Sequence, residues 1–142
     1  MRCRSDRTAH TELVAFMVPL LCCHTAIAHH SFAQFQMDKS LRIVGAVESF
    51  EWTNPHTWLV VLVDDGKGGQ SEWRLEGASV NELARAGWTK RVAQQGERVS
   101  VEIHPLRSGQ PGGAFVSMTK ADGSVFSQIT KEQQAAAAAS AP

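Results

Sequence analysis

The stretch from Phe50 to Trp58 constrains the fold more than any other part of this sequence. It joins two apolar runs through a segment that contains Asn54 and Pro55. Proline fixes its own φ angle and disfavours the helical region for the residue before it, so this dipeptide marks a turn. We therefore predict a turn between two β-strands that presents a polar tip, and His56 at that tip is the first candidate functional residue.

Five segments have the residue pattern of β-strands. Most of them alternate between core-facing and solvent-facing residues, whereas the second is apolar on both faces, as expected of a strand covered on both sides. Gly45 in the first segment predicts a bulge or a sharp bend. The turn signal Asp122-Gly123 predicts a short extra strand at Val125-Phe126. The five main segments are residues 41–52, 58–63, 71–76, 97–104 and 114–120.

One segment between the third and fourth predicted strands has a helical period. Ser79 and Glu82 have the spacing of a capping box, in which each side chain satisfies a free amide of the first helical turn. An apolar stripe follows, and Gly87 is a natural C-terminal stop. The stripe consists of Val80, Leu83, Ala84 and Trp88.

This order of elements predicts a mainly β fold, a small OB-like five-stranded barrel with one helix between strands 3 and 4. The helix is expected to plug one end of the barrel. A small β-sandwich with an inserted helix is the alternative. The predicted core comprises Leu41, Ile43, Val47, Val60, Leu62, Trp73, Leu75, Leu83, Val99, Val101, Ile103 and Val116.

Residues 1–28 have the three-part pattern of a secretory signal peptide. Three arginines precede an apolar run at residues 13–23, and Ala26-Ile27-Ala28 supplies small residues at the two positions that a signal peptidase reads. The run is too short to cross a bilayer comfortably as a permanent helix. We expect cleavage after Ala28, a periplasmic or secreted product and no stable membrane insertion, and an uncleaved tethered helix is the alternative.

The remaining chain divides into an N-terminal arm (29–40), an OB-like barrel domain (41–127) and a disordered alanine-rich tail (128–142), for which a frayed helix is the alternative. Cleavage would remove all three cysteines, so the mature chain would contain no disulfide. It would also remove three of the 14 basic and two of the 14 acidic residues, which leaves 11 and 12. A chain so close to neutral lacks the positive surface that nucleic acid binding requires.

Four strings, in this order and at this spacing, resemble a family of small exported bacterial proteins known only as a domain of unknown function. The similarity extends from His29 to about Phe126. Family members commonly have aspartate where this chain has Ser108, which removes a carboxylate from that loop. The resemblance implies an exported small β protein and no established activity. The strings are Ala28-His29-His30-Ser31-Phe32, Trp52-Thr53-Asn54-Pro55-His56, Ala86-Gly87-Trp88-Thr89 and His104-Pro105-Leu106-Arg107-Ser108-Gly109.

The loops after strands 1 and 4 lie beside the binding face of an OB-type barrel, so we expect His56 and His104 to be neighbours. Arg107 offers a planar donor fork for a carboxylate or phosphate. The first hypothesis is therefore a binding module for a small anion, a peptide or an envelope protein. Its predicted ligand-binding residues are Trp52, Asn54, His56, Trp58, His104 and Arg107.

The alternative hypothesis is a copper-binding protein or chaperone, although the sequence requires no cofactor. Imidazole is a good copper ligand, and cleavage after Ala28 would give His29 a free amine that can bind the same ion. Met37 and Met118 are further candidate donors for Cu(I), and Trp52 or Trp58 is a candidate cation–π cap. The predicted metal ligands are His29, His30, His56 and His104.

Nothing in the sequence has the pattern of an enzyme, so we expect none. Ser31 and Ser108 lack the strand–turn–helix context of a nucleophile elbow. The glycine-rich stretch at residues 66–69 lacks the strand–loop–helix setting of a phosphate cradle. Glu51 and His56 are a candidate acid–base pair, but one such pair in a turn is a common coincidence.

Overall fold

The computed structural model describes residues 32–139, so the predicted signal peptide and the candidate ligands His29 and His30 lie outside the described range. A short 3-10 helix at Phe32–Gln34 begins this range. The elements that follow are β1 (Leu41–Glu51), β2 (Trp58–Asp64), β3 (Gln70–Glu76), α1 (Val80–Arg85), β4 (Arg98–Pro105), β5 (Gly112–Lys120), β6 (Val125–Ser127) and α2 (Lys131–Ala139).

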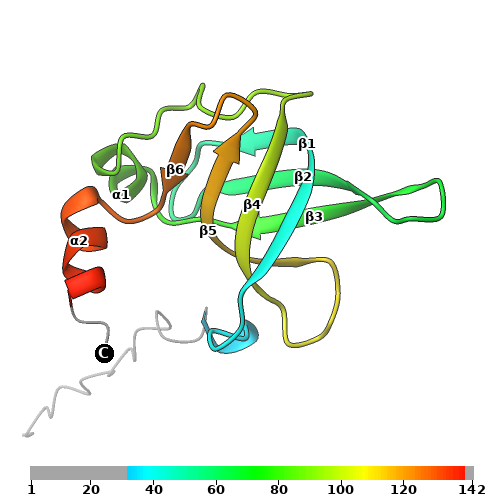
Figure 1. Ribbon diagram of the computed structural model, residues 1–142, viewed down its shortest axis with the longest axis horizontal. Coiled ribbons are helices and arrows are strands. Elements are labelled where there is room, and N and C mark those ends of the chain that lie inside the picture. The colour runs from blue at the N-terminus through cyan, green and yellow to red at the C-terminus, as the bar shows by residue number, and fades with distance from the viewer. Residues whose placement is uncertain (1–31, 140–142) are drawn as a thin grey trace, which may run out of the picture.

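The strands form a closed barrel. Antiparallel pairs link them in the order β3-β2-β1-β4-β5, and β6 continues from β5. A parallel pairing of β3 with β5, from Arg74–Gly112 to Glu76–Ala114, closes the first five strands. Figure 1 shows α1 and β6 at one end of this barrel and the long β2–β3 hairpin at the other. The predicted fold class, an OB-like five-stranded barrel with a helix between strands 3 and 4, is confirmed.

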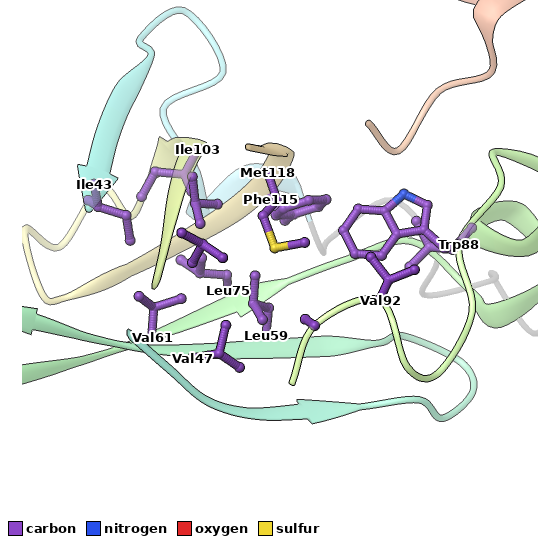
Figure 2. Packing of buried hydrophobic residues seen from close by; sticks show 14 residues of the cluster. Ile43, Val47, Leu59, Val61, Leu75, Trp88, Val92, Ile103, Phe115 and Met118 are labelled. Atoms are coloured by element: carbon purple, nitrogen blue, oxygen red, sulfur yellow. The ribbon is translucent and has the colours of Figure 1, made fainter. Parts of the chain in front are cut away.

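The barrel interior is filled by side chains from all five strands, from α1 and from the loop after it (Figure 2). Seven predicted core residues lie in this cluster, and Trp73 packs against it. The seven are Ile43, Val47, Leu75, Leu83, Val99, Val101 and Ile103. The prediction omitted the other seven members, namely Leu59, Val61, Trp88, Val92, Ala93, Phe115 and Met118.

In β2 the prediction chose Val60 and Leu62 as core residues, whereas the barrel interior contains Leu59 and Val61. Leu59 and Val61 belong to the interior cluster, so Val60 and Leu62 face the other side of the strand. Val60 is nevertheless buried there, whereas Leu62 is half-buried. Because every residue from 59 to 63 is apolar, the sequence contained no alternation that distinguished the two faces.

Two further core predictions fail for local reasons. Leu41 is 39% exposed because it begins β1 at the rim of the barrel. Val116 is half-buried because the β4–β5 register shifts beside it, leaving it as the extra residue of a bulge. In β1 the shift lies between Val47 and Ser49 rather than at Gly45, so the predicted bulge is displaced along the strand.

The segment after β6, predicted as a disordered tail with a frayed helix as the alternative, contains α2. Its run of five alanines, from residue 135 to residue 139, accounts for the helix, because alanine has the highest helix propensity. Within residues 32–139, neither helix combines the length and the apolar character that a membrane span requires.

Candidate functional site

The turn between β1 and β2 is shaped by its own polar side chains. Thr53 Oγ1 donates a hydrogen bond to the carbonyl oxygen of His56 (3.3 Å). Asn54 Oδ1 accepts one from the backbone N–H of Val80 (3.1 Å) and so connects the turn to the first residue of α1. The Asn54–Pro55 peptide bond is cis. The predicted ligand-binding residue Asn54 therefore has a structural role.

Thr57 connects the same turn to the segment between β3 and α1. It is 1% exposed, and its Oγ1 donates to the carbonyl oxygen of Ala78 (2.9 Å). Its backbone N–H donates to the same oxygen, and its own carbonyl accepts from Gly77. These bonds hold the preceding residue, His56, in a defined position against the end of β3.

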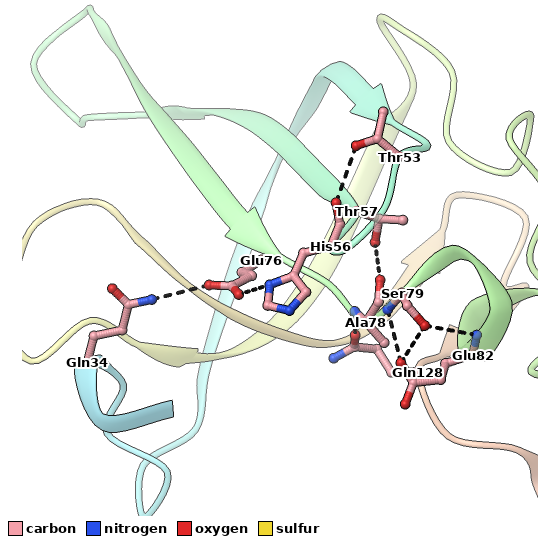
Figure 3. A network of polar contacts seen from close by, with 9 residues as sticks. All are labelled: Gln34, Thr53, His56, Thr57, Glu76, Ala78, Ser79, Glu82 and Gln128. Carbon is pink, nitrogen blue, oxygen red and sulfur yellow. Dashed lines mark hydrogen bonds and ion pairs between the residues drawn. The ribbon is translucent and has the colours of Figure 1, made fainter. Parts of the chain in front are cut away.

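His56 is paired with Glu76. The β2–β3 register places Trp58 opposite Glu76, and from there the turn brings His56 Nδ1 onto Oε1 of this carboxylate. The second oxygen, Oε2, accepts from Gln34 Nε2 (3.2 Å), as Figure 3 shows. A carboxylate that is 8% exposed requires such partners. The pairing makes Nδ1 the donor and directs the ring's Nε2 away from Glu76.

This pair lines a cleft of about 480 Å³, within the size range of small-molecule sites. The cleft lies outside the barrel interior, between the β1–β2 turn, the end of β3, α1, the N-terminal arm and the segment after β6. Its polar lining includes His56, Glu76, Glu82, Arg85 and Gln133. Its apolar lining includes Phe32, Phe35, Pro55, Ala114 and Ile129.

The charged side chains that line the cleft differ in their hydrogen bonds and salt bridges to the rest of the protein. Hydrogen bonds from the side chain and then the backbone of Ser79 lower the pKa of Glu82, and the charges of Arg85 and His56 act in the same direction. Ser79 Oγ donates to Glu82 Oε2 at 2.6 Å, in the predicted capping box. Arg85, by contrast, forms no salt bridge with any residue between 32 and 139.

The capping box predicts a pH-dependent stability. The lowered pKa of Glu82 means that its contribution is present above the ordinary value of 4.5 and is lost as pH falls through the folded-state pKa. We expect Ser79→Ala to lower the free energy of unfolding by about 1 kcal/mol near pH 7 and by less near pH 3. Urea unfolding at both pH values measures this, with Asn81→Ala on the same helix as the control. An equal loss at both pH values would contradict the assignment.

His104 and Arg107 lie outside the cleft and hold the N-terminal arm instead. His104 Nδ1 donates to the carbonyl oxygen of Lys39 (2.7 Å), and Arg107 Nε donates to that of Ala33 (3.0 Å). In the sheet, Ala114 lies between His104 and Glu76. Of the two imidazoles that were expected to be neighbours, that of His56 lines the cleft and that of His104 binds the N-terminal arm.

The two candidate tryptophans also have partners within the protein. Trp52 packs against the core, with its ring 5.6 Å from that of Phe50. Trp58 is covered by the guanidinium of Arg74, 4.5 Å from the ring centroid. Arg74 in turn binds both carboxylate oxygens of Glu51 at 3.1 Å. Glu51 is therefore paired with Arg74, and the carboxylate bound to His56 is that of Glu76.

The predicted metal ligands are not brought together within the described part of the chain. Among residues 32–139, no group of three or more His, Cys, Asp or Glu side chains is arranged to hold a metal ion. Met118 is fully buried in the core, and Met37 is 45% exposed and outside the cleft lining. Of the four predicted histidines, only His56 lines the cleft, while His29 and His30 lie outside the described range.

Sequence reasoning missed Glu76, Glu82 and Arg85 as site residues. Glu76 appeared only as the last residue of a predicted strand, and Glu82 only as part of a helix cap. The register of the β2–β3 hairpin was the one signal available. It pairs Trp58 with Glu76, so the turn residues just before Trp58 lie close to that carboxylate. Arg85 had no comparable signal, since its place in the cleft depends on how α1 packs.

A model of a family of unknown function matches residues 19–115, about two thirds of the chain, which confirms the resemblance noted from the sequence. The match includes the arm, the β1–β2 turn, α1 and the strands up to Phe115 in β5. It therefore covers most of the cleft lining but not the segment after β6. No curated protein and no solved structure shows a significant match to the chain.

Proposed function

The chain belongs to this family, DUF6152, and we propose that it is an exported, non-enzymatic binding module for a small organic anion. The signal peptide pattern of residues 1–28 supports export. The observation that carries the binding proposal is the cleft built around the His56–Glu76 pair. Small-molecule sites are typically concave and mostly apolar, with a few convergent polar groups, and this cleft has that composition.

The charges favour an anionic ligand. Both carboxylates in the cleft already accept hydrogen bonds from the protein, Glu76 from His56 and Gln34 and Glu82 from Ser79. Arg85 lines the cleft and forms no salt bridge with any other residue between 32 and 139. Its planar donor fork matches a carboxylate or phosphate group. The Nε2 atom of His56 offers a second polar contact across the cleft.

The apolar lining favours an organic ligand over a bare inorganic ion. Phe32 is 61% exposed and Ile129 is 42% exposed, and both line the cleft. Covering such surface contributes about 25 cal/mol per Å² of apolar area removed from water. A ligand with a carboxylate at Arg85 and an apolar body between these side chains would use both parts of the lining.

The hydroxyl groups in the cleft support binding without covalent chemistry. Ser79 Oγ donates to Glu82, and Thr130 Oγ1 accepts from the backbone N–H of Gln133 (3.3 Å). Neither hydroxyl is paired with His56, as an activated nucleophile would be. His56 therefore acts as an oriented binding group in this proposal.

An NMR titration of the isotope-labelled protein with benzoate, hexanoate and inorganic phosphate tests this function. We expect the two carboxylates to shift amide resonances around the cleft and to bind more tightly than phosphate. Arg85→Ala is expected to weaken carboxylate binding at least tenfold, because a charge-assisted hydrogen bond contributes roughly 1.5–3 kcal/mol. Arg91→Ala, an exposed arginine outside the cleft, is the matched control.

Two results would overturn the proposal. One is that neither carboxylate shifts resonances of the cleft residues. The other is that Arg85→Ala and Arg91→Ala weaken carboxylate binding equally, which would indicate a diffuse charge effect rather than a site.

A further inference from the structure

We propose that the ligand of the cleft is a para-hydroxylated aromatic acid, whose carboxylate binds Arg85 and whose hydroxyl group donates a hydrogen bond to Nε2 of His56. This inference rests on the proposed function, because it names the class of organic anion that the same cleft would take. Three observations support it: the hydrogen bonds of the His56 ring, the positions of His56 and Arg85 along α1, and the exposed ring of Phe32.

The first observation is that His56 presents a hydrogen-bond acceptor to the cleft. An ionised carboxylate only accepts hydrogen bonds, so the contact with Glu76 requires a proton on Nδ1. In the neutral imidazole, Nε2 then carries the lone pair, on the side of the ring away from Glu76 (Figure 3). No residue between 32 and 139 donates to Nε2, and the His56 side chain is 39% exposed and lines the cleft. A ligand group that donates a hydrogen bond, such as a hydroxyl, therefore fits this atom.

The second observation is the separation of the two polar contacts. Asn54 accepts from the backbone N–H of Val80, so the turn that carries His56 lies at the first residue of α1. Arg85 is the last residue of the same six-residue helix. Such a helix is about 9 Å long, because each residue adds about 1.5 Å. His56 and Arg85 therefore approach a ligand from opposite ends of α1, which favours a molecule with its two polar groups at opposite ends.

The third observation is the aromatic part of the apolar wall. Phe32 and Phe35 both line the cleft, but Phe35 is 2% exposed whereas Phe32 is 61% exposed. The ring of Phe32 is therefore accessible to a ligand, and aromatic rings attract one another in edge-to-face or offset arrangements. A rigid ring also loses less conformational freedom on binding than a flexible chain. An aromatic body consequently suits this wall better than an aliphatic one.

The test is an NMR titration of the isotope-labelled protein at about pH 8, where histidine is ordinarily neutral. The four ligands are benzoate and its para-hydroxy, para-methoxy and para-carboxy derivatives, the last being terephthalate. We expect para-hydroxybenzoate to bind about fivefold more tightly than benzoate, as one neutral hydrogen bond contributes. The para-methoxy derivative keeps the oxygen but has no proton to donate, so it is expected to lack this advantage.

Variants assign the advantage to His56. In His56→Ala, the ratio of the benzoate to the para-hydroxybenzoate dissociation constant is expected to fall from about five to about one. His104→Ala, which removes an imidazole outside the cleft, is expected to keep the wild-type ratio. A general loss of carboxylate binding does not change the ratio, because both ligands are compared on the same variant. The comparison with para-methoxybenzoate needs no variant, so it decides the question even if His56→Ala does not fold.

The inference is wrong if para-hydroxybenzoate binds no more tightly than benzoate, or if para-methoxybenzoate binds as tightly as para-hydroxybenzoate. Tightest binding of terephthalate would also contradict it, because Nε2 would then be a donor, and so would a wild-type ratio in His56→Ala. If benzoate shifts the cleft resonances but the hydroxyl group gives no advantage, only this inference fails and the proposed function stands. If none of the four ligands shifts them, the proposed function fails and this inference fails with it.

Discussion

Replacing Trp88 with alanine is expected to lower the free energy of unfolding by about 3–5 kcal/mol, the range for removing a buried aromatic side chain. Trp88 is 3% exposed, and its ring lies 5.7, 5.2 and 5.5 Å from those of Phe50, Phe115 and Phe126. Its Nε1–H donates to the carbonyl oxygen of Ser127 (2.8 Å). Removing it would leave a cavity among three rings and an acceptor in β6 without its donor.

Urea unfolding of Trp88→Ala, Trp88→Phe and Trp58→Ala measures this effect. Trp88→Phe keeps most of the volume and is expected to cost less than the alanine variant. Trp58→Ala removes an indole that lies on the outer side of β2 under Arg74, and we expect a loss of about 1 kcal/mol. A loss no larger for Trp88→Ala than for Trp58→Ala would show that the aromatic cluster contributes little to stability.

The elements of the fold were predictable because their signals are local. The capping box at Ser79 and Glu82 begins α1 as its spacing predicts, and the Asn54-Pro55 signal does mark the turn between β1 and β2. Trp88 illustrates the limit of such signals. It was recognised as part of the apolar stripe of a helix, yet it lies three residues beyond Arg85, the end of α1. Its partners come from three strands distant in sequence, which no periodicity reveals.

The candidate site was predictable only in part. The turn that carries His56 was identified from residue types alone, because Asn54-Pro55 marks a turn between two apolar runs. Its partner was within reach of the same reasoning, since the β2–β3 hairpin pairs residues equidistant from Lys67 and places Trp58 opposite Glu76. His56 lies two residues before Trp58, and the turn brings its ring into contact with the carboxylate of Glu76 at the end of β3.

A shared site of His56 and His104 was inferred from the general fold, and the arm explains why only His56 lines the cleft. Phe35 is 2% exposed and pairs with Leu106, so the arm occupies the surface beside the end of β4. His104 and Arg107 then bind the arm's carbonyl oxygens instead of a ligand. The arm has no clear hydrophobic period, and its position depends on contacts with residues about 70 positions later in the chain.

Gly45→Ala is expected to destabilise the protein by about 3 kcal/mol, because it forces a methyl group into backbone that cannot move aside. A Cβ at this position would overlap the carbonyl oxygen of Leu62 and lie 2.7 Å from Cγ1 of Val61. β1 pairs with β4 up to Ala46 and with β2 from Ala46 onward, so Gly45 lies where one strand changes partners. The glycine is therefore required by this close approach between strands of the barrel.

Gly69→Ala is the matched control, because its new methyl group would meet only the carboxylate end of Asp65 in the β2–β3 loop (2.8 Å). That side chain is exposed, and turning it aside costs at most the hydrogen bonds that its Oδ1 accepts from the backbone N–H groups of Lys67 and Gly69. We therefore expect a loss of about 1 kcal/mol, well below that of Gly45→Ala. Urea unfolding at neutral pH compares the two variants. If Gly45→Ala were as stable as Gly69→Ala, β1 and β2 would have to be further apart than the barrel places them. The route of β1 from β4 to β2, and with it the position of the turn that carries His56, would then be wrong.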